Sequence, residues 1–155
     1  MITINDNFLD QLNAKAKASS RLRSTFNFHK EANDPMHRML NAMEPGTYVP
    51  PHKHENPDKR EACLVLRGKI ALFTFYDDGT VKSATILGPE TGNYGIELPP
   101  KTWHNLICIE KNSVAYEVKD GPWDPDNDKI FAPWAPKESD KKAEKYMEQL
   151  IAQLQ

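Results

Sequence analysis

Residues 62–87, ACLVLRGKIALFTFYDDGTVKSATIL, decide the fold class of this chain. The runs 62–67, 69–76 and 80–87 are short and rich in Val, Ile, Leu, Phe and Thr, as strands usually are. Asp78-Gly79 separates the last two runs, and this dipeptide is a strong hairpin signal because glycine accepts the positive φ of the turn. The stretch therefore predicts consecutive antiparallel strands.

Short strands are also expected on the C-terminal side of this stretch, at Tyr94–Leu98, Trp103–Ile109 and Ser113–Val118. Strands at intervals of about 8–12 residues, with turn residues between them, indicate an all-β barrel or sandwich. Helical periodicity is confined to residues 5–18 and 143–154. Asn5 or Asp6 is the expected cap of the first helix, and Ser139 or Asp140 that of the second.

The chain is expected to form one domain over residues 1–155. Its expected parts are an N-terminal helix and arm at 1–30, a barrel at 36–120, and a loop rich in Pro and Trp with the C-terminal helix at 121–155. Twelve prolines concentrate at 45–57, 99–100 and 122–136, which marks those segments as loops and edges because proline has no amide donor.

Composition excludes several classes of function. The formal net charge is −2 with both signs interspersed, so neither a nucleic acid nor a membrane is an expected partner. No apolar run approaches the roughly 20 residues of a membrane span. The start, MITINDNFLDQLNAK, is not that of a secretory signal, and Cys63 and Cys108 form neither a disulfide framework nor a zinc motif. We expect a cytoplasmic protein.

Three histidines and a glutamate are the candidate metal ligands. His52 and His54 are two residues apart, so on a strand both side chains point to the same side. Glu61 begins the next strand, and His104 follows the turn-like segment Pro99–Thr102. Imidazoles with one carboxylate suit a divalent transition metal such as Fe, Mn, Zn or Ni. The alternative is a pair of solvated surface histidines and an exposed glutamate at a strand end.

The same residues resemble the two motifs of the cupin superfamily. Gly46, His52, His54, Glu61 and Gly68 occur in the order of the first motif, and the segment ending in His104 is similar to the second. Six residues separate His54 from Glu61 where the family has three or four, and Lys101 stands where the second motif has glycine. The resemblance implies a single cupin jelly-roll β-barrel with flanking N- and C-terminal helices. It also implies one divalent metal bound by His52, His54, Glu61 and His104.

A closer resemblance, to the WbuC-type cupin metalloproteins, covers nearly the whole chain. Segments spread from the N-terminal arm to the C-terminal loop carry it: Arg21-Leu22-Arg23, Asn27-Phe28-His29, Asp34-Pro35, Arg38, Tyr48-Val49, Lys59, Pro99-Pro100, Glu117–Pro122, Lys129, Phe131-Ala132 and Trp134. Members are small bacterial proteins often associated with surface-polysaccharide gene clusters. The resemblance implies a bound metal, a small-molecule ligand such as a sugar, and a homodimer.

Other polar residues are candidates for the ligand site. Arg23, Asn27, Arg38 and Tyr48 are expected to bind substrate, since arginine suits a carboxylate or phosphate and tyrosine supplies a hydroxyl. Alternatively, the first three tie the N-terminal segment to the barrel and Tyr48 belongs to the core. His29 and Lys59 are the candidate catalytic bases, although Lys59 can equally pair with Glu61 or be solvated.

Three functions remain open at this point. The first is a metal-dependent isomerase or epimerase acting on a sugar or nucleotide sugar in surface-polysaccharide biosynthesis. The second is an iron-dependent dioxygenase, and the third is a metal-dependent binding protein without turnover. A fold alone does not choose among them.

Overall fold

The computed structural model describes residues 1–154, so Gln155, the last residue of the expected C-terminal part, lies outside the described residues. The chain runs through two helices and ten strands. In chain order these are α1 (Asp6–Ala18), β1 (Arg23–Asn27), β2 (Met36–Met43), β3 (His52–Lys53), β4 (Glu61–Arg67), β5 (Ile70–Phe75), β6 (Val81–Leu87), β7 (Gly95–Leu98), β8 (Trp103–Cys108), β9 (Ser113–Asp120), β10 (Ile130–Phe131) and α2 (Ala143–Ile151).

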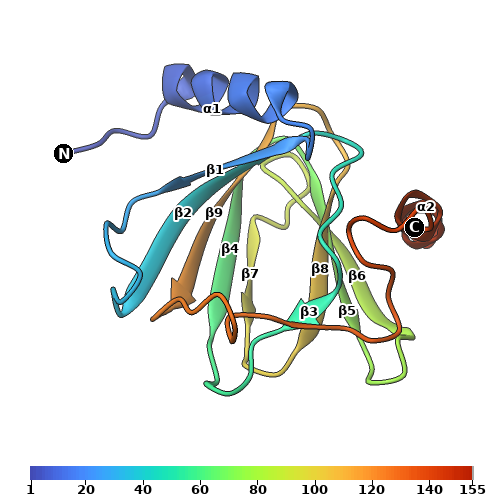
Figure 1. Ribbon diagram of the computed structural model, residues 1–155. Coiled ribbons are helices and arrows are strands. Elements are labelled where there is room, and N and C mark those ends of the chain that lie inside the picture. The colour runs from blue at the N-terminus through green and yellow to red at the C-terminus, as the bar shows by residue number, and fades with distance from the viewer. Residues whose placement is uncertain (155) are drawn as a thin grey trace.

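The strands form two five-stranded antiparallel sheets. One has the order β1-β2-β9-β4-β7 and the other β10-β3-β8-β5-β6, and Figure 1 shows them facing each other. Within residues 1–154 no strand pairing joins one sheet to the other, so the expected closed jelly-roll barrel is not confirmed. The chain is mostly β, as predicted, but its two sheets pack face to face with open edges.

Apolar side chains fill one end of the space between the sheets. Strand alternation sends Cys63 and Val65 of β4 inward, where they meet Leu72 of β5 and Cys108 of β8. Both cysteines are buried and free. Glu61 and His104 lie at the opposite end of the same strands, on the same inward faces. The apolar core therefore closes one end, and polar residues line the other.

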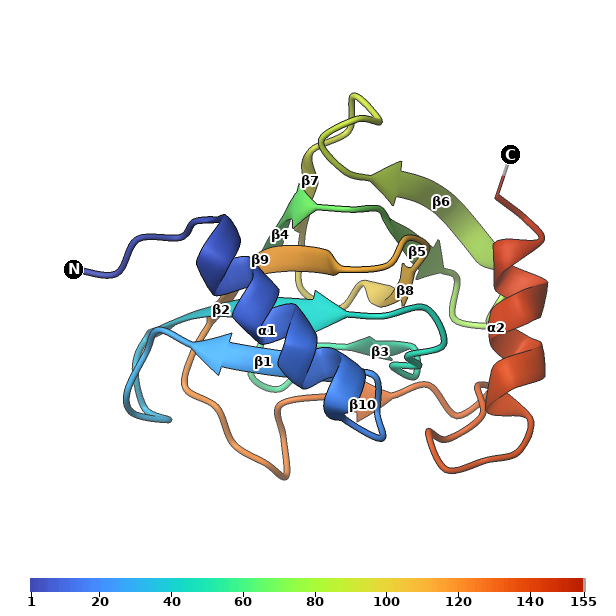
Figure 2. The same ribbon diagram turned by 90° about the horizontal axis from the view of Figure 1, so that it is seen from above.

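The two helices cover the outer faces of the two sheets, on opposite sides of the molecule (Figures 1 and 2). Leu9 and Leu12 of α1 pack on Leu40 of β2. Met147 of α2 packs in one cluster with Trp103 of β8, so Trp103 lies on the face of β8 opposite to His104. None of the described helices has the length and apolar content needed to cross a membrane.

Both helices begin close to the expected positions, but only the first has the expected cap. The Asn5 side chain accepts a hydrogen bond from the Phe8 amide at 3.1 Å, which confirms one predicted cap. Lys142 occupies the N-cap position of α2 and makes no side-chain capping bond. Asp140 instead accepts a hydrogen bond from the Lys142 amide at 2.9 Å, and so stabilises the turn that precedes the helix.

The predicted Asp78-Gly79 turn joins β5 to β6. Gly79 has φ +88°, and a Cβ atom placed on it would lie 2.7 Å from the Trp134 ring. Trp134 belongs to the C-terminal loop and also packs on Phe75, with ring centroids 5.1 Å apart. The hairpin and the loop are therefore in close contact, and glycine is required at position 79 both for its backbone conformation and for this packing.

Replacing Gly79 by alanine should destabilise the fold more than replacing Gly92. Both residues have positive φ, at a cost of about 1–2 kcal/mol for alanine, but a Cβ on Gly92 meets nothing within 4 Å. Overpacking against Trp134 should add about 1–3 kcal/mol to Gly79→Ala. Urea unfolding of the two variants measures the difference. Equal losses of unfolding free energy would show that the loop does not pack on the hairpin.

Candidate metal centre

Three buried histidines converge at the polar end of the space between the sheets. His52 on β3 pairs directly with His104 on β8, which places the two imidazoles side by side with ring centroids 4.5 Å apart. His54 lies two residues beyond His52 and presents its ring to the same side. One nitrogen from each ring lies within 4.8 Å of the others, so the group can hold a metal ion.

Each imidazole is oriented by a backbone carbonyl oxygen. The Nδ1 atom of His52 lies 3.0 Å from the Pro50 oxygen, and that of His104 lies 2.8 Å from the Thr102 oxygen. The Nδ1 atom of His54 contacts the Asp128 oxygen. A carbonyl oxygen can only accept, so each Nδ1 must carry the proton and donate it. The three Nε2 lone pairs are consequently available to a metal, as in metal sites whose second ring nitrogen is hydrogen-bonded.

Glu61 brings a carboxylate to the cluster from the opposite sheet. Its Oε2 atom lies 2.9 Å from Nε2 of His54 and 3.7 Å from Nε2 of His104. Because the Nδ1 proton of His54 is donated to a carbonyl, Nε2 and Oε2 can be this close only with a second proton or a cation between them. A donor set of three imidazoles and one carboxylate fits a divalent transition metal. The chemistry of the residues present therefore matches a bound metal.

Burial and neighbouring charges set the ionisation of these groups. Burial lowers the pKa of the His52 imidazole well below its usual value, and the Lys129 ammonium lowers it further. Burial also lowers the pKa of His104, against the opposing effect of Glu61. Burial alone would raise the pKa of the Glu61 carboxyl, but the His54 hydrogen bond and neighbouring positive charge outweigh it and lower the pKa to about 2. Neutral imidazoles and an ionised carboxylate are the forms that bind metals.

At both positions where the sequence departs from the cupin motifs, the chain forms a turn. The six residues between His54 and Glu61 form a turn in which Asn56 has φ +58°. Lys101, in the place of the family's glycine, has φ +66°, the left-handed conformation that glycine adopts most easily. The Lys101 amide donates to the His54 carbonyl oxygen at 3.0 Å. The turn geometry is thus retained, and it connects the two histidine segments.

Beneath His54, a buried aspartate neutralises two lysines. The Asp128 carboxylate accepts from Lys59 Nζ at 2.8 Å and from Lys119 Nζ at 2.6 Å. The positive charge of Lys119 and the hydrogen bonds from both lysines outweigh burial, which acts in the opposite direction, and lower the pKa of Asp128. Lys59, a candidate base, thus points to Asp128 and does not reach Glu61. It fixes the segment whose carbonyl holds His54.

The histidine cluster borders a cavity of ≈ 440 Å³ between the sheets and the C-terminal loop. His52, Glu61 and His104 lie in its wall. The rest of the wall is contributed by both sheets and by the loop: Arg21, Arg23, Thr25, Asn41, Met43, Val49, Pro50, Leu106, Glu117, Trp123, Lys129, Phe131 and Glu138. Its volume and its mixture of apolar and polar groups are typical of a small-molecule site.

The predicted ligand-binding residues divide between this cavity and other places. Arg23 lines the cavity, while Asn27 and His29 line a neighbouring cavity of ≈ 390 Å³. The His29 ring stacks on His37 with centroids 3.9 Å apart, so the structure does not bring this candidate base to the imidazole cluster. Five residues, Thr25, Asn41, Glu117, Trp123 and Lys129, line both cavities, which therefore adjoin.

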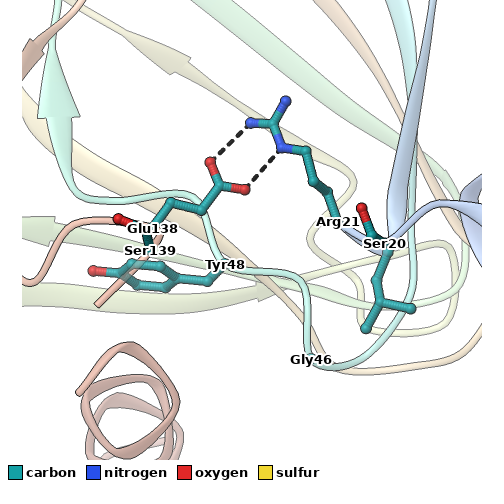
Figure 3. A pocket seen from close by; sticks show the side chains of 7 residues that line it. Ser20, Arg21, Gly46, Tyr48, Glu138 and Ser139 are labelled. Carbon is teal, nitrogen blue, oxygen red and sulfur yellow. Dashed lines mark hydrogen bonds and ion pairs between the residues drawn. The ribbon is translucent and has the colours of Figure 1, made fainter. Parts of the chain in front are cut away.

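Arg38 and Tyr48 are placed outside the cavity wall. The Arg38 guanidinium pairs with Asp34 at 3.3 Å on the surface. Tyr48 belongs to the core beneath α2, and its hydroxyl donates to the Pro136 carbonyl oxygen at 3.0 Å. With Arg21 and Glu138, Tyr48 also lines a separate pocket of ≈ 520 Å³, which Figure 3 shows. Both residues have structural contacts, as the alternative reading of the sequence allowed.

Several residues of the cavity wall were not predicted from the sequence. Glu117 on β9 accepts from the Asn41 amide at 2.8 Å, and Asn41 on β2 accepts from the Thr25 hydroxyl at 2.7 Å. Burial, with the charge of Glu61, raises the pKa of Glu117 to about 7. Strand alternation was an available signal for Glu117, because it shares a face with Ala115 and Lys119. Asp128 and Lys129 could not be found in this way, because they lie in the loop, where the residues follow no strand or helix period.

Comparison with known proteins extends these findings. A family model described as "Domain of unknown function (DUF6016)" matches residues 4–87, more than half of the chain. A comparison with curated proteins gave no match.

Three solved structures are similar at low identity. KdgF from Halomonas sp. is 16% identical, with a TM-score of 0.52 over 67% of this chain and 83% of KdgF. CapF, a capsular polysaccharide assembling protein from Staphylococcus aureus, is 20% identical, with a TM-score of 0.56 over 73% of this chain and 32% of CapF. An oxalate oxidase in complex with the substrate analogue glycolate is 13% identical, with a TM-score of 0.54 over 75% of this chain and 58% of the oxidase.

These three are cupin-fold proteins, so the chain has the cupin fold. It spans about a third of CapF and little more than half of the oxidase. Within this fold, the group of His52, His54 and His104 could hold a metal ion.

Replacing Asp128 by asparagine should destabilise the protein strongly, because it leaves the buried ammonium groups of Lys59 and Lys119 without a counter-charge. A loss of about 3–5 kcal/mol is expected at neutral pH by urea unfolding. Asp126→Asn, at an exposed position of the same loop, should change little.

The pH dependence of this loss gives a second readout. The folded-state pKa of Asp128 lies below its usual 3.8, so its contribution is complete above that value and is lost as the pH falls through the folded-state pKa. The difference between wild type and Asp128→Asn should therefore shrink in strong acid. A constant difference across that range would contradict the ion-pair account.

Proposed function

This chain belongs to the family described as domain of unknown function DUF6016, and from its imidazole cluster we propose that it is a metalloprotein holding one divalent transition metal on His52, His54, Glu61 and His104. The observation that carries the proposal is the arrangement of the three Nδ1 atoms, each on a carbonyl oxygen. That arrangement leaves the three Nε2 atoms free to bind a metal, and those of His54 and His104 lie 2.9 Å and 3.7 Å from one Glu61 oxygen. Iron, manganese, zinc and nickel all accept such a donor set.

The proposed ligand is a small polar molecule such as a sugar. The cavity beside the metal ligands is ≈ 440 Å³, and its wall offers hydroxyl, amide, carboxyl and ammonium groups. A cavity of this size suits a monosaccharide better than a complete nucleotide sugar. The description of CapF as a capsular polysaccharide assembling protein and the likeness to WbuC-type proteins support a connection with surface polysaccharides.

Isomerisation or epimerisation of such a ligand is the reaction class that we propose. When bound, a divalent ion would act as a Lewis acid toward a ligand oxygen. Arg23 would orient the ligand at the mouth of the cavity. Glu117, whose pKa is raised to about 7 by burial and by Glu61, is the cavity residue suited to exchange a proton with the ligand near neutral pH. It replaces His29 and Lys59 as the candidate base, because both have other contacts.

Elemental analysis of protein purified without added metal or affinity nickel tests the metal site. The wild type should contain close to one divalent metal per chain, and His52→Ala and His104→Ala should lose nearly all of it because each removes one of three imidazole ligands. His29→Ala is the matched control, since His29 lies in the neighbouring cavity, and it should retain the metal.

A wild-type protein without metal, which takes up none of Fe(II), Mn(II) or Zn(II) on titration, would contradict the proposal. If a metal is present, its identity separates the remaining functions. Oxygen uptake by an iron-containing form would support a dioxygenase. Tight binding of a sugar that is recovered unchanged would support a binding protein without turnover.

A further inference from the structure

The charged side chains in the wall of the metal cavity balance before any metal is bound. Three are cationic (Arg21, Arg23 and Lys129) and three are carboxylates (Glu61, Glu117 and Glu138). A divalent ion would therefore leave two surplus positive charges in this space. If Glu117 is protonated, the surplus rises to three. A surplus of positive charge in the cavity wall favours a ligand that brings negative charge.

The two arginines are already occupied by one carboxylate. Arg21 donates two hydrogen bonds to Glu138, both at 2.8 Å, as Figure 3 shows, and Arg23 donates to the same carboxylate at 2.7 Å. Arg23 also donates to the Tyr48 carbonyl oxygen at 3.0 Å. Their charge contributes to the field in the cavity, but both guanidinium groups are bound to Glu138 and half of their ten N–H donors are engaged.

Lys129 differs in its partners from Arg21 and Arg23, the other two cations of the cavity wall. Among the described residues no carboxylate oxygen lies within 4.0 Å of its ammonium group, whereas the adjacent Lys119 is bound to Asp128. Lys129 lines both the metal cavity and the neighbouring one. Lys129 is exposed, and it lines the metal cavity together with His52, Glu61 and His104. Among the described residues it is the cation of this wall without a carboxylate partner, so its charge is available to an incoming anion.

Hydroxyl partners lie in the same wall. Thr25, Asn41 and Glu117 form a hydrogen-bonded chain across β1, β2 and β9, and all three line both cavities. The Glu117 carboxyl is held by Asn41 through one oxygen, and no hydrogen bond to its other oxygen is made within residues 1–154. A chain of hydroxyl, amide and carboxyl groups offers donors and acceptors to a ligand with several hydroxyls.

We propose that the ligand of the metal cavity is a small hydroxylated acid of about monosaccharide size, whose anionic group binds Lys129 while its hydroxyls contact Thr25, Asn41 and Glu117. The inference rests on the proposed metal site, because the divalent ion creates the surplus positive charge. Either a carboxylate or a phosphate supplies the anion, and the test separates the two.

Isothermal titration calorimetry of the zinc-loaded protein tests this inference. Glucuronate and glucose are a matched pair that differ at the carboxylate, and glucose 1-phosphate supplies the phosphate. Wild type should bind at least one of the two anions about 10-fold or more tightly than glucose, since a hydrogen bond to a charged group contributes on that scale. A preference for glucuronate assigns a carboxylate, and a preference for glucose 1-phosphate assigns a phosphate.

Variants then assign the preference to Lys129. Lys129→Ala should weaken binding of the preferred anion about 10- to 100-fold and leave glucose unchanged, and Lys129→Arg should restore most of the affinity. Lys141→Ala removes an exposed lysine outside the cavity wall and should have no effect. Zinc content is measured in every variant, so that loss of metal is not mistaken for loss of anion binding.

Two results would overturn the inference but not the proposed metal site. In the first, the zinc-loaded wild type prefers neither anion over glucose, or binds none of the three compounds. In the second, Lys129→Ala retains both its zinc and its affinity for the anion. A wild type that binds no zinc, iron or manganese overturns the proposed function, and the inference fails with it because no surplus charge then exists.

Discussion

Three backbone carbonyl oxygens determine which nitrogen each buried imidazole turns toward the cavity. Two of these oxygens, from Pro50 and Thr102, lie two residues before the histidine that they orient, so they are provided by the local strand geometry. The third, from Asp128, lies 74 residues beyond His54. The cluster is therefore complete only when the C-terminal loop has closed over the end of the paired sheets. The donor set, the cavity and the charge balance all depend on that closure.

Two buried lysines, Lys59 and Lys119, hold the C-terminal loop in place. Lys59 and Lys119 approach Asp128 from the segment before β4 and from β9, and bring the loop to one position between them. A buried ion cluster costs desolvation and adds little net stability, whereas breaking it is expensive. We infer that its main effect is to specify where the Asp128 carbonyl lies. Phe131, on the same loop, pairs with His52 across β10 and β3, and adds a second point of attachment.

Much of the ligand set could be predicted from the sequence because it follows strand alternation. His52 and His54 share a side, Cys63 and Val65 follow Glu61 inward, and Trp103 points away from His104. The positions of Lys59, Lys129 and Glu138 could not be predicted, since each depends on contacts across more than 60 residues of chain or on an aperiodic loop. The strands β1, β2 and β10 were also missed, because their residues show no clear alternation and pairing with a neighbour makes them strands.

X-ray absorption spectroscopy at the zinc edge of the zinc-loaded protein tests the central claim most directly. We predict three imidazole nitrogens at about 2.0–2.1 Å and one carboxylate oxygen at about 2.0–2.2 Å, with the multiple scattering of histidine rings. A shell made only of oxygen atoms, without ring scattering, would contradict the account. Zinc would then be bound elsewhere, and the three carbonyl-anchored imidazoles would be a structural feature of the cupin fold in this chain.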